Sequence, residues 1–305
     1  MKSINQWRRQ LRESAWLLGI CEDGYDDLKA GRIHWIDNGK YKKKKWFADP
    51  FILEYDNEKI TLLVEEFDYK EHRGRIARLY VDRKKWTVTD CKIILDIDTH
   101  LSFPMIWREH GEIYVCPENY KSGGWSMYRY DADAESLTFV KKIIDEKLTD
   151  ATIWKDGDDY WLISTYDPNP NGKELTLWKS VALGGPYKKI QKVCFAENTA
   201  RNAGMIIKCG CKLIRPAQES NITYGHSIVF QEVKKENDKL AFCEIFRFQT
   251  PHKIFDAGAH TFNQHKGGMA VIDVKGYRYR YIAKLLSSFG SLLVNLGLKK
   301  PFVIR

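Results

Sequence analysis

The chain has 305 residues, of which 44% are hydrophobic and 29% charged. This is a globular composition that excludes wholesale disorder and allows a core without disulfides. The net charge is +9 and aromatic residues make up 13% of the chain. Such an aromatic content favours a β-rich fold or a carbohydrate site, where flat rings stack on sugars.

Near the N-terminus, neither a signal peptide nor a spanning helix is expected. The apolar run of residues 15–20 is too short for a secretory signal, and no stretch of 18 apolar residues exists. The seven cysteines are therefore expected to be free, mostly buried thiols in a reducing compartment. Cys209 and Cys211 lack the second pair that a zinc site needs. We expect no metal and no cofactor.

A pattern of two apolar strands joined by a turn occurs five times along the chain. The copies cover residues 47–66, 100–118, 149–164, 200–219 and 258–273. When Asp49, Phe103, Asp150, Asn202 and His260 are aligned as anchors, successive copies lie 47 to 58 residues apart. This period, with four short strands per unit, is typical of a β-propeller. We predict an all-β, five-bladed β-propeller over residues 1–280, with residues 16–21 as a strand that closes the last blade.

The innermost strand of each blade lines a central channel, so residues far apart in sequence should meet near one mouth. The anchor positions contribute Asp49, Asp150, Arg201 and His260. The ends of the second strands add Glu65 or Glu66, Glu118, Arg215 and Gln218. Only one residue of the pair Glu65 and Glu66 can face inward, because side chains alternate along a strand.

The ordered motifs of this chain resemble a known family. FADPF, HLSFP, YVCPE, TDATIW, TARNAG and RPAQE follow one another from about residue 49 to residue 260. The set is similar to the N-terminal domain of plant glucosamine inositolphosphorylceramide transferase and its bacterial relatives. The resemblance implies a five-bladed propeller of the arabinanase and invertase kind, and a role linked to surface polysaccharides. It does not include the separate transferase domain of the plant protein, and the His-rich fifth-blade motif is reduced to residues 260–263.

Glycosyl chemistry uses two carboxyl groups, one to attack or act as base and one to protonate the leaving group. The resemblance implies that Asp49 is the base or nucleophile, because an Asp at this first-blade position has that role in the glycosidase relatives. Glu118 and Asp150 are the candidate partners, and burial beside like charges would separate their pKa values. The alternative is that these carboxylates cap blade turns by accepting hydrogen bonds from backbone N–H groups.

Other polar residues of the same segments are candidate substrate ligands. A guanidinium binds phosphate or carboxylate at two points, so Arg201 and Arg215 suggest a nucleotide-sugar or an acidic sugar. An Arg–Asp network that only joins blades is the alternative. The remaining candidates for substrate binding are Glu65, His100, Ser102, Asn202, Gln218, Tyr224 and His260.

Two further charged stretches have simpler interpretations. Asp156, Gly157 and Asp158 imitate a metal-binding motif, but they lie between two strands and are expected to form a turn. The basic run at residues 40–45 could attract the phosphates of nucleic acid. No recognition motif accompanies it, so we expect a solvated loop and no nucleic acid partner.

Residues 281–305 are predicted to form a basic amphipathic helix. The apolar positions recur at helical spacing: Ile282, Leu285, Leu286, Phe289, Leu292, Leu293 and Leu296. With the basic residues around it, this helix could lie on an anionic membrane surface, near a lipid-linked acceptor. Packing on the propeller or on a second subunit is the alternative.

These observations predict a carbohydrate-active protein. We expect transfer of a sugar during surface polysaccharide or glycolipid synthesis, in the cytoplasm or on the inner membrane as a peripheral protein. A glycoside hydrolase with the same carboxylates, and a non-catalytic glycan-binding or scaffold propeller, are the two alternatives.

Overall fold

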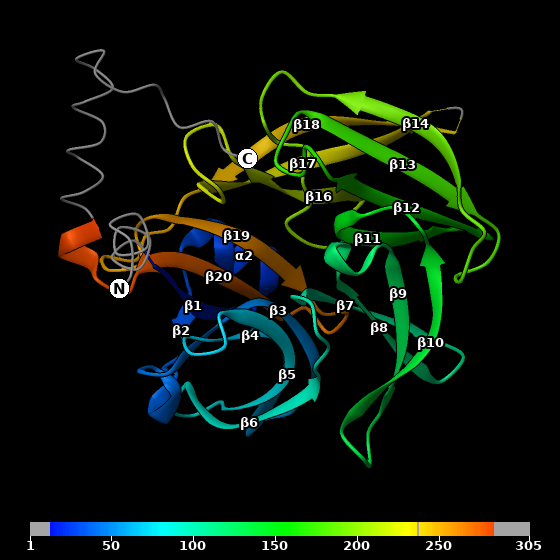
Figure 1. Ribbon diagram of the computed structural model, residues 1–305. Helices are drawn as coiled ribbons and strands as arrows, with labels where there is room; N and C mark the ends of the chain where they lie inside the picture. Colours follow the sequence, from blue (N-terminus) through cyan, green and yellow to red (C-terminus); the bar gives the residue numbers. More distant parts are fainter. Residues whose placement is uncertain (1–12, 237, 284–305) are drawn as a thin grey trace, which may run out of the picture.

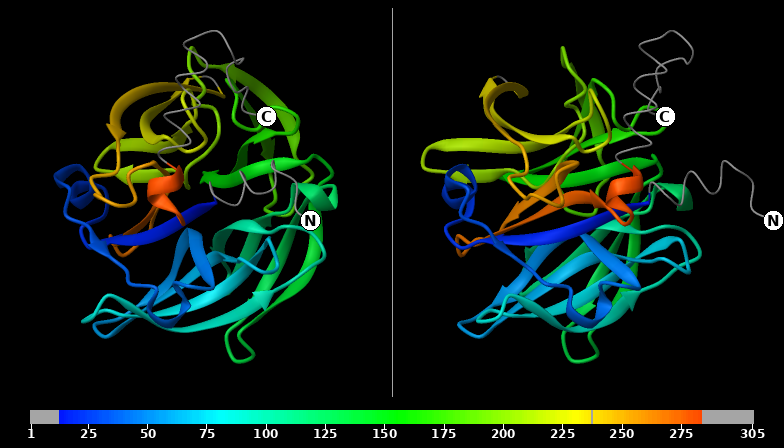
Figure 2. Two further views of the ribbon diagram at one scale, coloured as in Figure 1. Left: turned by 60° about the vertical axis from the view of Figure 1, so that its left-hand side comes forward. Right: turned by 90° about the vertical axis from the view of Figure 1, so that its left-hand side faces the viewer.

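The computed structural model describes residues 13–236 and 238–283. These residues form five antiparallel sheets of four strands each, arranged around a common axis (Figures 1 and 2). The prediction of an all-β, five-bladed propeller is therefore confirmed.

The first four blades follow one another along the chain. The first contains β3 (Lys45–Tyr55), β4 (Lys59–Asp68), β5 (Arg73–Asp82) and β6 (Thr87–Leu95). The second contains β7 (Ser102–Glu109), β8 (Glu112–Glu118), β9 (Trp125–Asp131) and β10 (Ser136–Ile144). The third contains β11 (Leu148–Asp156), β12 (Asp159–Tyr166), β13 (Glu174–Ser180) and β14 (Lys188–Cys194). The fourth contains β15 (Ile207–Cys209), β16 (Lys212–Glu219), β17 (Ser227–Glu236) and β18 (Lys239–Phe248).

The fifth blade combines strands from both ends of the chain. It consists of β19 (Gly258–Gln264), β20 (Ala270–Tyr277), β1 (Ser14–Cys21) and β2 (His34–Trp35). β1 pairs with β20 along its whole length, from Ser14 opposite Tyr277 to Cys21 opposite Ala270. Figure 2 shows the blue β1 beside the orange β20. This pairing closes the ring and leaves β20 without a free edge.

Short helices connect some of these strands. They are α2 (Gly24–Ala30), η1 (Gly39–Tyr41) and η2 (Tyr120–Ser122). The basic run begins in η1 and ends at the start of β3, and most of it is exposed. Asp156 and Asp159 pair as the last residues of β11 and the first of β12, so the Asp-Gly-Asp stretch forms the expected hairpin turn.

The pairing of the first and second strands is interrupted at the same place in four blades. The interruptions lie between Ala48 and Phe51, Ser102 and Met105, Thr149 and Thr152, and Ala259 and Phe262. Three of the aligned anchors adopt positive φ there: 49° at Asp49, 42° at Phe103 and 45° at Asp150. A bulge bends the strand and re-aims the extra residue's side chain. These bulges set the positions of the site residues.

The hydrophobic core lies between neighbouring blades and includes the fully buried Trp125, Trp161 and Trp178. The seven cysteines are free. The expectation that most of them are buried is wrong, because only Cys21 and Cys116 are buried.

Among residues 13–236 and 238–283, no helix is long and apolar enough to cross a bilayer. The predicted amphipathic helix lies outside the described residues from residue 284 onward.

Candidate active site

Acidic side chains from four different blades lie close enough to interact with one another. This cluster of five buried acids consists of Asp49 on β3, Glu65 on β4, Glu118 on β8, Asp150 on β11 and Asp273 on β20. Burying so many carboxyl groups together is costly unless each one is paired, hydrogen-bonded or protonated. Their partners and pKa shifts therefore indicate what the site can do.

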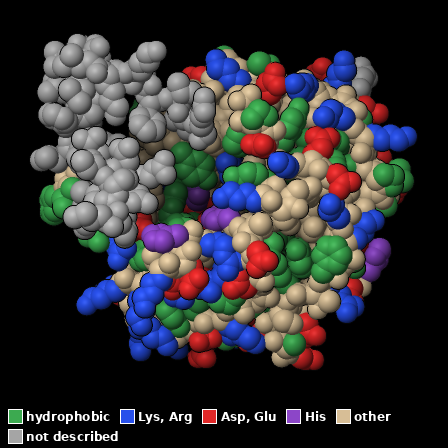
Figure 3. Space-filling view, in the orientation of Figure 1, with side chains coloured by type: hydrophobic (Ala, Val, Ile, Leu, Met, Phe, Trp, Pro, Cys, Tyr) green, Lys and Arg blue, Asp and Glu red, His purple; other side chains and the backbone are tan. Residues whose placement is uncertain are grey.

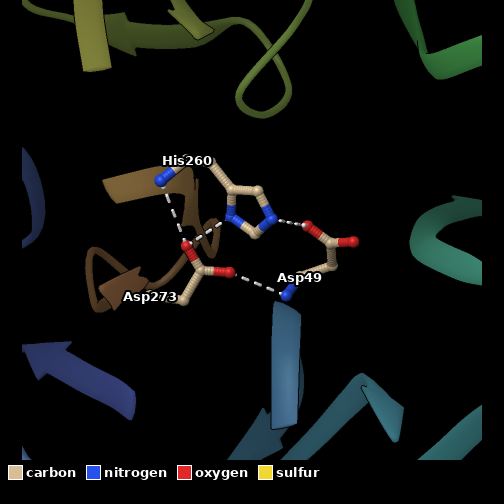
Figure 4. A group of neighbouring side chains, drawn as sticks. All are labelled: Asp49, His260 and Asp273. Carbon is tan, nitrogen blue, oxygen red and sulfur yellow. Dashed lines mark hydrogen bonds and ion pairs between the residues drawn. The ribbon is translucent and has the colours of Figure 1, made fainter. Parts of the chain in front are cut away.

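Asp49, His260 and Asp273 form one hydrogen-bonded group (Figure 4). His260 Nδ1 lies 2.7 Å from Asp273 Oδ1, and His260 Nε2 lies 3.5 Å from Asp49 Oδ1. The backbone N–H of Asp49 donates to Asp273 Oδ2 at 2.8 Å. The Thr261 hydroxyl donates to Asp49 Oδ1 at 2.7 Å, and the backbone N–H of Phe103 donates to Asp49 Oδ2 at 3.1 Å. The carboxylate of Asp49 is thus fixed by groups from two other blades.

The charges of this group shift the pKa values of its members. Burial raises the pKa of Asp49 to about 6, with His260 opposing the rise and Asp150 and Asp273 adding to it. Burial lowers the pKa of His260, but Asp273 and Asp49 outweigh this effect and hold the pKa above its ordinary value. The indole ring of Trp16 stacks on the imidazole, with ring centroids 3.8 Å apart. Asp49 can therefore act as a base near neutral pH.

Glu118, Asp150 and Arg201 form a second group. Arg201 Nε lies 2.7 Å from Asp150 Oδ2, and Arg201 Nη2 contacts both Asp150 Oδ1 and Glu118 Oε2 at 3.1 Å. The backbone N–H of Asp150 also donates to Glu118 Oε2 at 2.9 Å. One guanidinium is therefore shared by two carboxyl groups.

This sharing separates the pKa values of the two carboxyl groups. Burial raises the pKa of Glu118 well above its ordinary value, against the attraction of Arg201. Burial acts in the same direction on Asp150, but the charge and hydrogen bonds of Arg201 overcome it and lower the pKa. The opposite directions of the two shifts favour a proton on Glu118 and a negative charge on Asp150.

Gln218 and Asn202 support this second group. Gln218 Nε2 donates to Asp150 Oδ2 at 2.5 Å and to the backbone oxygen of Asn202 at 3.0 Å. The Asn202 amide donates to the backbone oxygens of Asp150 and Ile163. Gln218 Oε1 is buried and has no hydrogen-bond partner within the described chain.

The remaining acid of the cluster, Glu65, lies beside His100. His100 Nε2 is 3.3 Å from Glu65 Oε1, and His100 Nδ1 accepts the backbone N–H of Gly74 at 2.9 Å. Burial lowers the pKa of His100 to about 4, so the imidazole is neutral at pH 7. Burial and the nearby carboxylates raise the pKa of Glu65 well above its ordinary value. Ser102 is buried and pairs with Glu118 in the sheet.

Arg215 has a different environment from the other candidates. Its guanidinium donates to Asn202 Oδ1 at 2.8 Å and Gln231 Oε1 at 2.7 Å, and to the backbone oxygens of Thr199 and Ala200. Among its described partners there is no carboxylate of the cluster. The structure places Arg215 in a network of neutral oxygens behind the site.

A cavity of about 990 Å³ adjoins the second group. Arg201 lies in its wall beside Tyr120 and Asp167, and amide side chains line much of the rest: Asn169, Asn171, Asn198 and Asn221. Asn171 Oδ1 accepts a hydrogen bond from Arg201 at 3.0 Å. Amides and hydroxyls both donate and accept hydrogen bonds, as sugar hydroxyl groups require. Figure 3 shows a hollow on the face seen in Figure 1, with histidine side chains at its edge.

Three residues of the first group were not expected from the sequence: Asp273, Thr261 and Trp16. The sequence held one signal for Asp273, which is the single acid within the otherwise apolar run of residues 270–274. Asp49, His260 and Asp273 each offer a ligand atom within 4.8 Å of the others and could hold a metal ion. They also satisfy one another by hydrogen bonds as they stand.

The chain is similar to several known proteins. A family model described as glucosamine inositolphosphorylceramide transferase 1, N-terminal, matches residues 37–267. Glucosamine inositolphosphorylceramide transferase 1 of Oryza sativa subsp. japonica is 28% identical over 197 residues, which cover 62% of this chain and 26% of the relative. The match thus spans about a quarter of the length of that relative.

Among solved structures, the propeller resembles glycoside hydrolases. A family 117 glycoside hydrolase from Zobellia galactanivorans gives a TM-score of 0.52 at 11% identity, covering 87% of this chain and 91% of that one. An exo-β-1,3-galactanase from Phanerochaete chrysosporium gives 0.51 at 11% identity, covering 70% and 54%. At this level of identity, the likeness concerns the fold.

Proposed function

Because this chain belongs to the family of the glucosamine inositolphosphorylceramide transferase 1 N-terminal domain, we propose that it is a carbohydrate-active enzyme. It transfers a sugar during the synthesis of a surface polysaccharide or glycolipid. The observation that carries the proposal is the set of three carboxyl groups with separated pKa values, Asp49, Glu118 and Asp150. Arg201, which pairs with the last two, lies in the wall of an amide-lined cavity.

In the proposed mechanism, Asp49 of the first group is the general base and Glu118 of the second group is the general acid. Asp49 accepts the proton of the acceptor hydroxyl as its oxygen forms a bond to the anomeric carbon. The bond from that carbon to the leaving oxygen breaks, and Glu118 gives its proton to this oxygen. Asp150 remains ionised beside Arg201 and, as a nearby negative charge, helps to keep the proton on Glu118.

Hydrolysis is the second candidate, and one observation favours it. A protonated Glu118 suits a leaving group that needs a proton, such as a sugar oxygen, more than it suits a nucleotide diphosphate, which leaves as a stable anion. In hydrolysis, water takes the place of the acceptor and loses its proton to Asp49. The carboxyl groups are the same in both reactions.

The test uses the full chain with nucleotide-sugars and with simple glycosides, each with and without a lipid acceptor that carries an inositol phosphate headgroup. A glycosylated lipid supports transfer, whereas free sugar released without acceptor supports hydrolysis. We expect Asp49→Asn to abolish either reaction. Asp133→Asn is the matched control, because Asp133 is exposed on a turn. Full turnover in the Asp49→Asn variant would contradict the catalytic assignment.

A further inference from the structure

Lys275 is a buried lysine on β20, two residues after Asp273. Its side chain and that of Asp273 therefore point to the same face of the strand. The residue is 7% exposed. Its ammonium group lies 5.8 Å from the ring of Trp16, the indole that stacks on His260. Lys275 thus stands directly behind the first group of the site.

The ammonium of Lys275 has fewer partners than its burial requires. It donates one hydrogen bond, to the backbone oxygen of Tyr224 at 3.0 Å. No described carboxylate pairs with it, whereas the buried Arg78 and Arg201 each pair with two acids. An ammonium has three N–H donors. Two of its donors and its positive charge therefore have no partner among the described residues.

Tyr224 links this charge to Arg201. The ammonium of Lys275 and the guanidinium of Arg201 each lie 5.4 Å from the centroid of the Tyr224 ring. The two cations are thus no farther apart than twice that distance. Arg201 also lies in the wall of the large cavity. The second cation of the site is therefore Lys275, and not Arg215, whose donors are taken up by neutral oxygens of the fold.

We propose that Lys275 and Arg201 form an anion subsite that binds a phosphate ester group of the substrate. The inference rests on the proposed function, because it assigns a ligand group to the same site. A phosphate ester has oxygens that point in different directions and can accept from two separate cations at once. The phosphate can belong to a sugar donor or to the headgroup of a lipid acceptor.

A structural role is the competing explanation, since the ammonium could merely hold the loop that carries Tyr224. Two variants separate the explanations. Lys275→Met keeps the apolar stem against Trp16 but removes the charge, whereas Lys275→Arg keeps a charge. Lys208→Met is the matched control, because Lys208 is exposed on the edge strand β15. Thermal unfolding establishes that each variant is folded.

The experiment titrates the full chain with two phosphate probes, glucose 1-phosphate and glycerophosphoinositol, and follows binding by calorimetry. Glucose, myo-inositol and glucuronate are the comparison ligands. We expect one or both phosphate probes to bind at least tenfold more tightly than their neutral counterparts. We expect Lys275→Met to lose this preference, and Lys275→Arg and Lys208→Met to keep it. The tighter probe identifies the donor or the headgroup as the source.

Three outcomes would overturn the subsite: no preference for phosphate in the natural chain, an unchanged preference in folded Lys275→Met, or glucuronate binding as tightly as the phosphates. This test needs no turnover. Phosphate binding without any glycosyl reaction would therefore refute the proposed function but support the anion subsite. Turnover without a preference for phosphate would support the proposed function but refute the subsite.

Discussion

At the scale of single residues, the buried carboxyl group of Asp49 lowers the stability of the folded chain at neutral pH. Burial is the largest cause that raises its pKa, from 3.8 to about 6. The folded chain therefore holds this proton more tightly than the unfolded chain does. It follows that the free energy of unfolding decreases as the pH rises from about 4 to about 6, because the buried carboxyl must ionise.

We predict that Asp49→Asn unfolds at a higher temperature than the natural chain at pH 8 but at the same temperature at pH 3.5. The gain at pH 8 should be on the order of 2 kcal/mol. Asparagine also tolerates the positive φ at this position. Calorimetric scans at the two pH values check the prediction, with Asp133→Asn as control. A lower unfolding temperature of Asp49→Asn at pH 8 would contradict it.

Glu118 allows a prediction that depends on the leaving group. Glu118→Gln keeps an oxygen to accept the backbone N–H of Asp150 but has no proton to give. We expect about a 10²- to 10⁴-fold loss of turnover with an alkyl glycoside, whose leaving oxygen needs a proton. With a nitrophenyl glycoside the loss should be much smaller. Rates for the two donors, measured side by side, give the ratio, and equal losses would show that Glu118 does not act as the acid.

At the scale of elements, the sequence predicted the anchor residues that recur once per blade, but it did not predict which residues of other blades they contact. Asp49 and Asp150 recur at the blade period, and the bulges at these positions give both residues positive φ. Phe103 was aligned with them, yet it contributes only its backbone N–H, which donates to Asp49. Contacts between blades depend on the closed ring, so a pattern within one blade does not reveal them.

Strand alternation explains two of the assignments. Glu65 joins the acid cluster, whereas Glu66 pairs with Lys45 and Arg75. Arg215 is three residues before Gln218 on β16, and residues an odd number apart point to opposite faces of a strand. The prediction that both side chains reach the site was therefore inconsistent with the alternation of side chains along a strand. Asp273 and Lys275, two residues apart on β20, share a face.

The closing strand β1 should make a large contribution to stability. Leu18 is fully buried between β20 and the first blade, whereas Leu17, on the opposite face of the same strand, is half-buried. We predict that Leu18→Ala lowers the free energy of unfolding by about 2–5 kcal/mol and Leu17→Ala by clearly less. Urea unfolding measures both. An equal effect of the two variants would indicate that the fifth blade is not closed by this strand.

At the scale of the whole molecule, the closed ring of blades brings residues that are far apart in sequence together at one site. Blades one, two, three and five contribute acids, the fourth contributes Gln218, and Arg201 lies in the segment between β14 and β15. The blade number followed from the repeat period, and the meeting of acids from different blades followed from the blade number. The direction of each pKa shift did not follow, because it depends on burial and on charges that come from other blades.

The C-terminal segment supports a prediction about where the protein is located. Its sequence combines leucines at helical spacing with flanking lysines and arginines, a pattern that suits the surface of an anionic membrane. We propose that the protein is cytoplasmic and binds the inner membrane there, beside a lipid acceptor. Charge attraction to such a surface falls steeply with ionic strength.

We expect the full chain to sediment with vesicles that contain anionic phospholipid, less so as salt increases, and a chain ending at residue 280 to remain in solution. Vesicles of neutral lipid are the control for the membrane. The shortened chain must keep the thermal unfolding and the phosphate binding of the full chain, since the propeller supplies both. Binding that is equal for the two chains would assign membrane attachment to the propeller or reject it. In that case the helical pattern would be better explained by packing against protein.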